Sequence, residues 1–262
     1  MQRLLGLARR AIERYNMIET GDVIAVGVSG GKDSLALLCA LCELRRFYPV
    51  PFTVKALVID PCFNNEEGDY SGIEKLCEEY GIECVIHRCE LYSLIFEIRK
   101  EKNPCSMCAK MRRGILHDIA KQMGCNKIAL GHHFDDVIEA VLMSMLYSSE
   151  IKTMLPKLHS TNFEGMELIR PLYKVKERDI ISWSNYNGLK FLRCACRFTA
   201  ESEHNEDLSK RKEMKELIKY LREKNPDADD NIFRSLHNVN MATIPGFRDS
   251  DSGELHSFLE KY

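Results

Sequence analysis

The sequence lacks any long apolar run, although 45% of its 262 residues are apolar. None of its apolar segments approaches the roughly 18–20 residues that a membrane-spanning helix needs, which excludes a helical membrane protein. The N-terminal stretch MQRLLGLARRAIERYNMI is basic and amphipathic, but it has no continuous apolar segment and no cleavage site of the kind that targeting signals carry. We therefore expect an ordinary surface helix within residues 1–20 of a cytoplasmic protein with no membrane partner.

An excess of charge of one sign is also missing. The chain has 37 Lys and Arg against 39 Asp and Glu, a net charge of −2, so bulk charge does not indicate nucleic-acid binding. A polyanion would need a local patch. Three clusters of basic residues are candidates, each of which is otherwise a solvated helix face: Arg3, Arg9, Arg10 and Arg14; Lys174, Lys176 and Arg178; and Lys210, Arg211 and Lys212.

Cysteine is plentiful, but a disulfide framework is not expected, because the count of eleven is odd and the chain carries no secretory signal. Most of these cysteines have the apolar neighbours of small core residues. Two pairs differ: Cys105 and Cys108 form a CxxC, and Cys194 and Cys196 form a CAC. Such pairs suit a four-thiolate zinc site or an iron–sulfur cluster. The alternative is that both pairs are incidental.

Apolar strand patterns alternate with helical patterns along most of the chain. Strands are predicted near 23–28, 53–60, 82–88 and 126–131, and helices follow them near 35–44, 70–80, 107–123 and 134–147. This order is typical of an α/β fold, a doubly wound, mostly parallel sheet with helices on both faces. We expect this domain to span residues 21–200, and a helical C-terminal extension to span 201–262.

The hexapeptide SGGKDS, residues 29–34, lies between the first strand and its helix. Backbone N–H groups at a glycine turn and a helix N-terminus bind phosphate, and Lys32 adds a positive charge. The stretch is not a Walker A loop, because Gly27 is one residue too close to Gly31 and because Asp33 follows the lysine. The plainer alternative is a connecting turn.

The stretch GHHFDDVIEAVLM places Asp135 and Asp136 at a helix start. They suit either N-terminal capping or a magnesium site that holds bound phosphates. His132 and His133 are ligands, acid/base groups or polar turn residues. Parallel strands deliver the SGGKDS turn, Asp60 and Gly131 to the same edge of the sheet, so one crevice is expected there.

Together these residues resemble the TtcA-type tRNA 2-thiocytidine synthetases of the PP-loop ATP-pyrophosphatase superfamily. The resemblance runs in order from about residue 20 to 200 through SGGKDS, PCSMCAKMRRGIL (104–116), KIALGHHFDDVIEAVLMSMLY (127–147) and IRPLYKVKERDI (169–180). It implies an adenine nucleotide alpha hydrolase-like fold. It also implies an enzyme that adenylates the C2 oxygen of a pyrimidine, cytidine 32 of the tRNA anticodon loop, and replaces that oxygen with sulfur, releasing pyrophosphate and AMP.

The resemblance also implies roles for particular residues. ATP and Mg²⁺ are bound by the PP-loop and three further positions, and Asp33 or Asp136 helps to hold the magnesium. Lys32, Asp33 and Asp136 act in catalysis, and Arg112 and Arg113 stabilise the negative transition state or are ordinary surface arginines. The implied nucleotide-binding residues are Ser29, Gly30, Gly31, Lys32, Asp33, Ser34, Val58, Gly131 and Asp136.

The family carries a [4Fe–4S] cluster on three cysteines, which leaves one iron open to bind sulfur; Cys105, Cys108 and Cys194 match those positions. The family's second pair is usually CxxC, whereas this chain has CAC. A zinc site or a closed cluster with Cys196 as fourth ligand therefore stays an alternative. There is no cysteine before 39 or after 196, so the terminal zinc ribbons of the related thiouridine synthases are absent, which favours the thiocytidine branch.

The implied partners are a tRNA substrate, a sulfur donor (a cysteine desulfurase or sulfide) and a second copy in a homodimer. Two other functions stay open from the sequence. One is thiolation of uridine or of another substrate by the same chemistry. The other is a non-catalytic sensor that binds a nucleotide and an iron–sulfur cluster or zinc.

Overall fold

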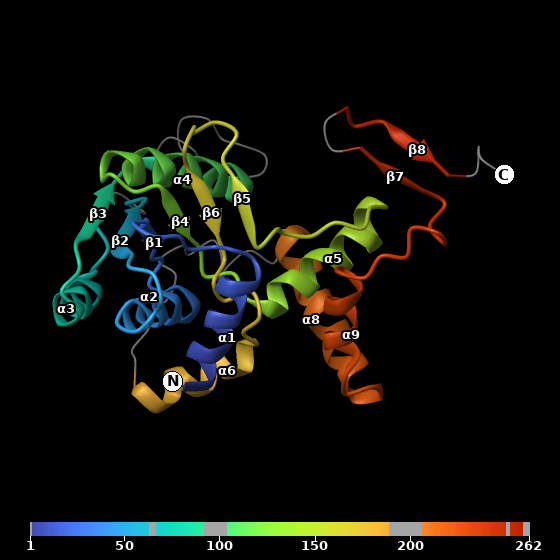
Figure 1. Cartoon of the computed structure of the whole chain (residues 1–262), viewed down its shortest axis with the longest axis horizontal. Coiled ribbons are helices and arrows are strands. Elements are labelled where there is room, and N and C mark those ends of the chain that lie inside the picture. The colour runs from blue at the N-terminus through green and yellow to red at the C-terminus, as the bar shows by residue number, and fades with distance from the viewer. Residues whose placement is uncertain (1, 63–66, 92–103, 189–205, 250–251, 259–262) are drawn as a thin grey trace. The chain divides into compact units, whose positions relative to one another are not determined.

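A computed structural model describes residues 2–62, 67–91, 104–188, 206–249 and 252–258. Its main feature is a six-stranded sheet in the order β3-β2-β1-β4-β6-β5, in which only β5 is antiparallel to its neighbour (Figure 1). The predicted α/β fold with a mostly parallel sheet is confirmed. The strands are β1 (Val23–Gly27), β2 (Thr53–Asp60), β3 (Cys84–Arg88), β4 (Lys127–Ala129), β5 (Lys157–His159) and β6 (Glu167–Ile169).

Helices cover both faces of the sheet (Figure 1). On one face, Leu116 and Ala120 of α4 pack on Ala25, Leu57 and Ile128 of the central strands. On the other face, α2 packs against β1 and β2 and also contacts α1 and α6. The helices of this part are α1 (Gln2–Arg14), α2 (Lys32–Leu44), α3 (Ser71–Tyr80), α4 (Pro104–Gln122), α5 (Phe134–Ser148) and α6 (Glu177–Asn187).

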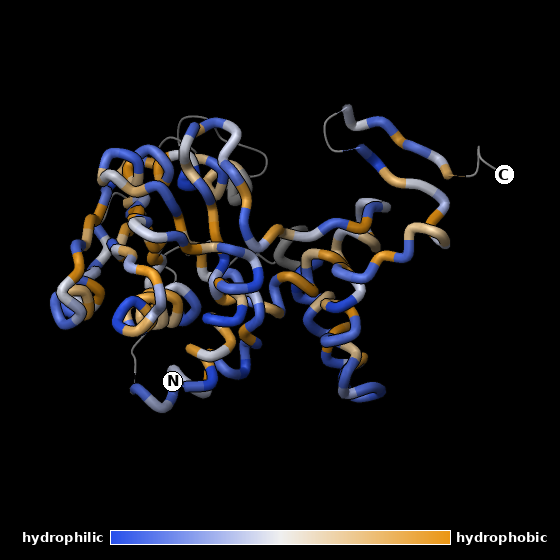
Figure 2. Tube along the Cα trace, in the orientation of Figure 1, coloured by the Kyte–Doolittle hydropathy of each residue, from blue (hydrophilic) through white to orange (hydrophobic). Residues whose placement is uncertain are grey.

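The central elements are apolar along most of their length because both of their sides are covered. In α2, every residue from Ser34 to Cys42 is buried, and Figure 2 shows this helix as largely hydrophobic. By contrast α1 is amphipathic and buries only Leu4, Ala8, Ala11 and Ile12, as its helical spacing predicts. Among the described residues, no helix is long and apolar enough to cross a membrane.

The chain divides into two compact units, Met1–Lys212 and Glu213–Tyr262. The second contains most of α8 (Glu206–Lys224), α9 (Ala228–Ser235) and the hairpin of β7 (Gly246–Arg248) and β8 (Leu255–Ser257). Arg222 on α8 forms an ion pair of 2.8 Å with Asp229 on α9, and Phe233 of α9 is buried. The sequence patterns predict these helices but not the hairpin.

A buried ion network joins the amino ends of the central strands, at the opposite edge of the sheet from the 29–34 loop. Lys127 is only 2% exposed; its Nζ lies 3.1 Å from Asp22 Oδ2 and 2.6 Å from Glu167 Oε2. Burial by itself lowers the pKa of Lys127, but Glu167 and Asp22 outweigh it and raise that pKa. Because Lys127 pairs with Ile24 in β1 and Glu167 in β6, this network fixes the order of three strands.

We expect Lys127→Met to lower the free energy of unfolding by roughly 3 kcal/mol, because it leaves the buried carboxylate of Asp22 without its cation and leaves Glu167 with Lys157 alone. Chemical denaturation of the full chain measures this, with Lys152→Met at an exposed lysine as control. Burial raises the pKa of Glu167, but Lys127 and Lys157 lower it more. This carboxylate therefore stabilises the fold above the unfolded pKa of about 4.3, and the difference between variant and wild type should shrink in acid. Equal stability of the two variants near pH 7 would contradict the prediction.

Candidate active site

The 29–34 loop is a closed turn held by its own serines. Ser34 Oγ accepts a hydrogen bond from the backbone N–H of Ser29 (3.1 Å) and donates one to the carbonyl of Gly31 (3.0 Å). Gly30 has a φ of +77°, a left-handed conformation that favours glycine. Gly31 then caps α2 with an extended backbone and no side-chain cap. The first turn of α2 therefore has backbone N–H groups available for an anion.

Gly131 lets a second loop approach this turn. A Cβ at Gly131 would lie 3.0 Å from the carbonyl carbon of Asp33 and 3.0 Å from the backbone nitrogen of Ser34. These are rigid backbone atoms, so any larger residue would push the two loops apart. The carboxyl end of β4 thus meets the start of α2, and two of the stretches expected in one crevice lie together.

Lys32 is the first residue of α2 and is half-buried. Its Nζ lies 2.8 Å from Glu177 Oε1 and 3.2 Å from Asp33 Oδ2. Burial opposes the charge on Lys32, but Glu177 and Asp33 outweigh this effect and raise its pKa. Glu177 begins α6, and its backbone N–H donates to Asp135 Oδ2 at 2.7 Å. Sequence reasoning missed Glu177; the available signal was an acidic residue at a helix start within IRPLYKVKERDI.

Three carboxylates surround the buried side chain of His133. Asp135 Oδ2 lies 3.7 Å from its Nδ1, and the other two face Nε2 of this ring. That Nε2 lies 3.7 Å from Asp33 Oδ1 and 3.5 Å from Asp136 Oδ2. Asp136 Oδ2 also accepts the backbone N–H of His133 at 2.9 Å, so it does cap α5. Asp33 Oδ1 is buried without a hydrogen-bond partner among the described residues. Two neighbouring carboxylates, one with an unused buried oxygen, fit a hard cation such as Mg²⁺.

His132 differs from His133 in its surroundings. Burial, followed by the nearby charge of Arg170, lowers the pKa of His132 to about 4, although Asp136 acts in the opposite direction. The imidazole of His132 is therefore neutral near pH 7. Its Nδ1 is buried and has no hydrogen-bond partner in the described part of the chain.

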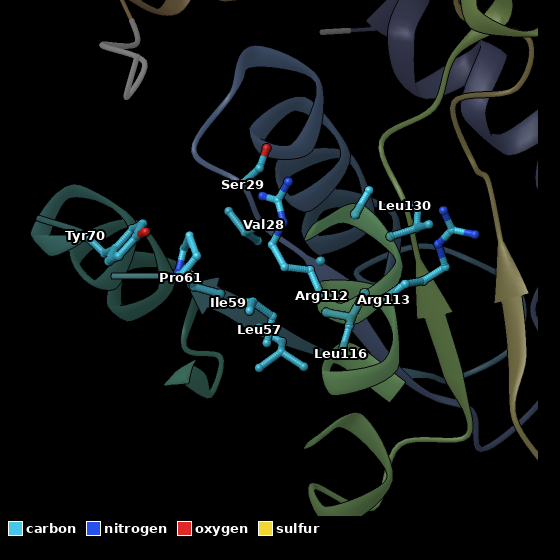
Figure 3. A pocket seen from close by; sticks show the side chains of 13 residues that line it. Val28, Ser29, Leu57, Ile59, Pro61, Tyr70, Arg112, Arg113, Leu116 and Leu130 are labelled. Carbon is cyan, nitrogen blue, oxygen red and sulfur yellow. The ribbon is translucent and has the colours of Figure 1, made fainter. Parts of the chain in front are cut away.

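A cavity of about 270 Å³ opens between the carboxyl ends of β1 and β2 and the side of α4 (Figure 3). Its walls are mostly apolar, with Ser29 at one side and two arginines from α4, which is typical of a site for a flat organic group next to an anion. The lining residues are Gly27, Val28, Ser29, Leu57, Val58, Ile59, Pro61, Tyr70, Ala109, Arg112, Arg113, Leu116 and Leu130.

The two arginines point in different directions. Figure 3 shows the Arg112 guanidinium extending toward Ser29, while Arg113 extends past Leu130. Burial raises the pKa of Tyr70 to about 12, and a smaller effect of the Arg112 charge opposes it. Burial lowers the pKa of Arg170 to about 10, with a smaller contribution from Arg113 in the same direction. Arg112 thus belongs to the cavity and the 29–34 loop, and Arg113 lies toward Arg170.

The CxxC lies at the start of α4. Positions 105 and 108 are three residues apart on this helix and share a face. Cys108 is 5% exposed, and this thiol and Leu91 pack with Cys89, Met107, Met111 and Ile115. Such apolar, sulfur-rich surroundings fit a thiolate-bound cluster. The side chain of Cys105 and the whole of Cys194 and Cys196 lie outside the described residues, within which no three metal-binding groups gather. The three-cysteine ligand set stays a prediction.

Two of the three basic clusters come together in space. Lys174 Nζ lies 5.6 Å from the ring centre of Tyr15 at the end of α1. Burial lowers the pKa of Lys174, and the charges of Arg14 and Arg10 lower it further. These three cations therefore share one surface between α1 and the segment before α6. Within the same clusters, Arg3 is paired with Asp179 at 3.1 Å.

The model of the PP-loop domain family matches residues 6–197. The chain is 39% identical to the tRNA-cytidine(32) 2-sulfurtransferase of Geotalea uraniireducens (strain Rf4), over 88% of this chain and 88% of that protein. It is also 39% identical to the protein of the same name from Geotalea daltonii, over 91% and 92%. Among solved structures, the U34-tRNA thiolase NcsA from Methanococcus maripaludis with its [4Fe-4S] cluster matches with a TM-score of 0.67 and 25% identity, over 91% of this chain and 78% of that one. The chain therefore belongs to the PP-loop family of tRNA-cytidine(32) 2-sulfurtransferases, as its motifs predict.

Proposed function

We propose that this protein is an ATP-dependent tRNA sulfurtransferase that converts cytidine 32 of the anticodon loop into 2-thiocytidine in the cytoplasm. The observation that carries the proposal is the convergence of the 29–34 loop, the Asp33–Asp136 pair and the Arg112 cavity at one edge of the sheet. The relatives named above match over almost their whole length, which supports the same activity for the whole chain.

The 29–34 loop binds the phosphates of ATP through its backbone N–H groups and Lys32. Glu177 forms an ion pair with Lys32, so phosphates at the loop compete with this carboxylate for the lysine. Val58 lines the cavity and contacts adenine there, and Gly131 keeps the opposite loop close. Asp33 and Asp136 supply carboxylate oxygens for the Mg²⁺ that accompanies the phosphates.

The C2 oxygen of the pyrimidine attacks the α-phosphorus of ATP, and pyrophosphate leaves. This step turns a poor leaving group into AMP. The guanidinium of Arg112, directed toward Ser29, stabilises the negative charge that builds on the phosphoryl oxygens. Sulfide then attacks C2 and AMP departs. Cys105, Cys108 and Cys194 would hold the [4Fe–4S] cluster, which would supply iron for binding sulfide.

The proposed activity also implies a sulfur donor, a surface for the tRNA and a second copy of the chain. The sulfur comes from a cysteine desulfurase or from free sulfide. The shared basic surface of Arg10, Arg14 and Lys174 is suited to the tRNA backbone. A homodimer is supported by a run of exposed apolar residues at the end of α5 and just beyond it: Met145, Leu146, Tyr147, Ile151 and Leu155.

Lys32→Ala should lower the rate of tRNA thiolation by about 100-fold, because it removes a charge that stabilises the transition state. Pyrophosphate release and nucleoside mass spectrometry on tRNA measure this, with ATP and sulfide supplied, and Lys152→Ala serves as the control. Iron content should not change. A non-catalytic sensor would show no thionucleoside even in the wild type. A product that is 2-thiouridine would keep the chemistry and refute the target base.

Arg112→Ala should reduce kcat by about 100-fold, and Arg113→Ala by less than about tenfold, because only Arg112 is directed at the 29–34 loop. The two variants are matched, since they remove the same charge from neighbouring positions of one helix. Single-turnover kinetics with saturating ATP compares them. The reverse order would show that Arg113 acts on the phosphoryl group.

Cys108→Ser should abolish the cluster, which anaerobic iron and acid-labile sulfide analysis detects together with the visible spectrum. Cys125→Ser is a close control, because both thiols are 5% exposed and Cys125 lies in the core cluster beneath α4. A Cys108→Ser protein that retains its full iron and sulfide would refute the ligand assignment. Zinc without sulfide in the wild type would instead indicate a structural thiolate site.

A further inference from the structure

A second pair of cysteines lies beside the cavity, at the carboxyl ends of β2 and β3. Cys62 follows β2 and adjoins Pro61, which lines the cavity, and Cys89 directly follows β3. Neither belongs to the motifs of the family resemblance. Both side chains are partly exposed, in contrast with the buried thiols of Cys39, Cys42 and Cys77.

Asp60 brings the two thiols together. Its carbonyl oxygen lies 3.3 Å from Cys89 Sγ and 3.9 Å from Cys62 Sγ, and it also accepts the backbone N–H of Cys89 at 2.9 Å. Its buried carboxylate accepts the backbone N–H groups of Cys62 (3.0 Å) and Gly68 (2.9 Å). Both sulfurs therefore lie within 4 Å of one backbone oxygen, and a disulfide between them would require their Cβ atoms to come about 4 Å apart.

Two further observations connect this pair with the active site. Cys89 packs against the cluster of Leu91 and Cys108, so it lies next to a position that the proposed iron–sulfur site uses. Cys62 has a φ of +48°, which is uncommon outside glycine and marks a constrained turn. Burial and then the charge of Asp60 raise the pKa of Cys62, while the backbone amide of Cys89 opposes them. The thiols of Cys62 and Cys89 thus lie on the same side of the Asp60 carbonyl.

We propose that Cys62 and Cys89 form a persulfide-processing thiol pair that releases sulfide next to the nucleotide cavity. This inference rests on the proposed function, because it supplies the sulfide that the second chemical step consumes. The sulfur source is a protein that carries a cysteine persulfide. Burial raises the pKa of both thiols, that of Cys89 to about 11, so each thiol must lose its proton to act as a nucleophile. The thiolate of Cys62, on the turn, accepts sulfane sulfur from such a donor by thiol exchange.

The two thiols supply both electrons that the release of sulfide requires. The Cys62 thiolate attacks the terminal sulfur of the donor persulfide, and the donor thiolate leaves. The Cys89 thiolate then attacks the sulfur that is bonded to the Cys62 carbon. The Cys62–Cys89 disulfide forms, the persulfide S–S bond breaks, and the terminal sulfur leaves as hydrosulfide. Both electrons that reduce this sulfur come from the two thiols, so a dithiol reductant must restore the pair before the next turnover.

The test compares two sulfur sources on the anaerobic, cluster-bearing enzyme with ATP and tRNA. One source is a persulfidated cysteine desulfurase freed of cysteine and thiols, and the other is sodium sulfide. With the persulfide source, the wild type should make about one thionucleoside per chain and then stop, and dithiothreitol should restart it. Cys62→Ser and Cys89→Ser should each lose about tenfold or more with the persulfide source and keep wild-type rates with sulfide.

Mass spectrometry of the peptides distinguishes the two roles. Cys89→Ser should accumulate a persulfide on Cys62, since no second thiol can resolve it, whereas Cys62→Ser should accumulate none. Cys84→Ser is the matched control, a partly exposed cysteine at the other end of β3, and it should behave as wild type with both sources. Iron content is measured for every variant, because Cys89 packs near Cys108.

Failure of this proposal and failure of the proposed function give different results. Wild-type rates of both variants with the persulfide source would overturn the proposal. So would a Cys62–Cys89 disulfide that forms without release of sulfide, which would make the pair only redox-sensitive. Absence of thionucleoside from the wild type supplied with sodium sulfide would instead refute the proposed function itself.

Discussion

The ion pair between Lys32 and Glu177 is the contact on which the arrangement of the site depends. It joins the first residue of α2 to the first residue of α6, and the backbone of Glu177 is in turn held by Asp135 in the first turn of α5. Three helix N-termini therefore meet at one edge of the sheet. Their positive dipole ends favour an anion there. Glu177 keeps Lys32 charged and holds its side chain in place.

Helix α4 forms the other wall and carries two kinds of chemistry. Cys108 and Arg112 are four residues apart, so they share one face of α4. Arg112 lines the cavity at the ends of β1 and β2, and Cys108 packs with Cys89 and Leu91 after the end of β3. Cys108 belongs to the proposed sulfur site, and Arg112 belongs to the cavity beside the 29–34 loop. A rigid helix therefore sets the distance between the proposed place of adenylation and the proposed place of sulfur supply.

Asp60 fixes a third group of residues at the same edge of the sheet. Its buried carboxylate fixes the turn after β2, and its carbonyl gathers the thiols of Cys62 and Cys89. The parallel register brings this about, because Asp60 lies opposite Arg88 and the residue after each strand emerges at the same level. In this way, the carboxyl ends of the strands bring together the groups that we propose to bind phosphate, sulfur and a cation.

The sequence by itself determined the local elements and the motifs they carry. The strand at 53–60 has the predicted bounds, and the helix of GHHFDDVIEAVLM begins at residue 134 as predicted, because apolar periodicity and helix-start signals act over a few neighbouring residues. The helices after the 29–34 loop and at the CxxC exist as predicted but begin three residues before the expected 35 and 107. Strands β5 and β6 have three residues each, too few for a pattern, so only their pairing in the sheet reveals them. The tertiary structure alone decided that Glu177 pairs with Lys32, that Arg112 and not Arg113 faces the loop, and that Cys62 meets Cys89. Each of these contacts joins groups from separate elements or depends on the rotation of a helix, and packing of the whole domain sets both.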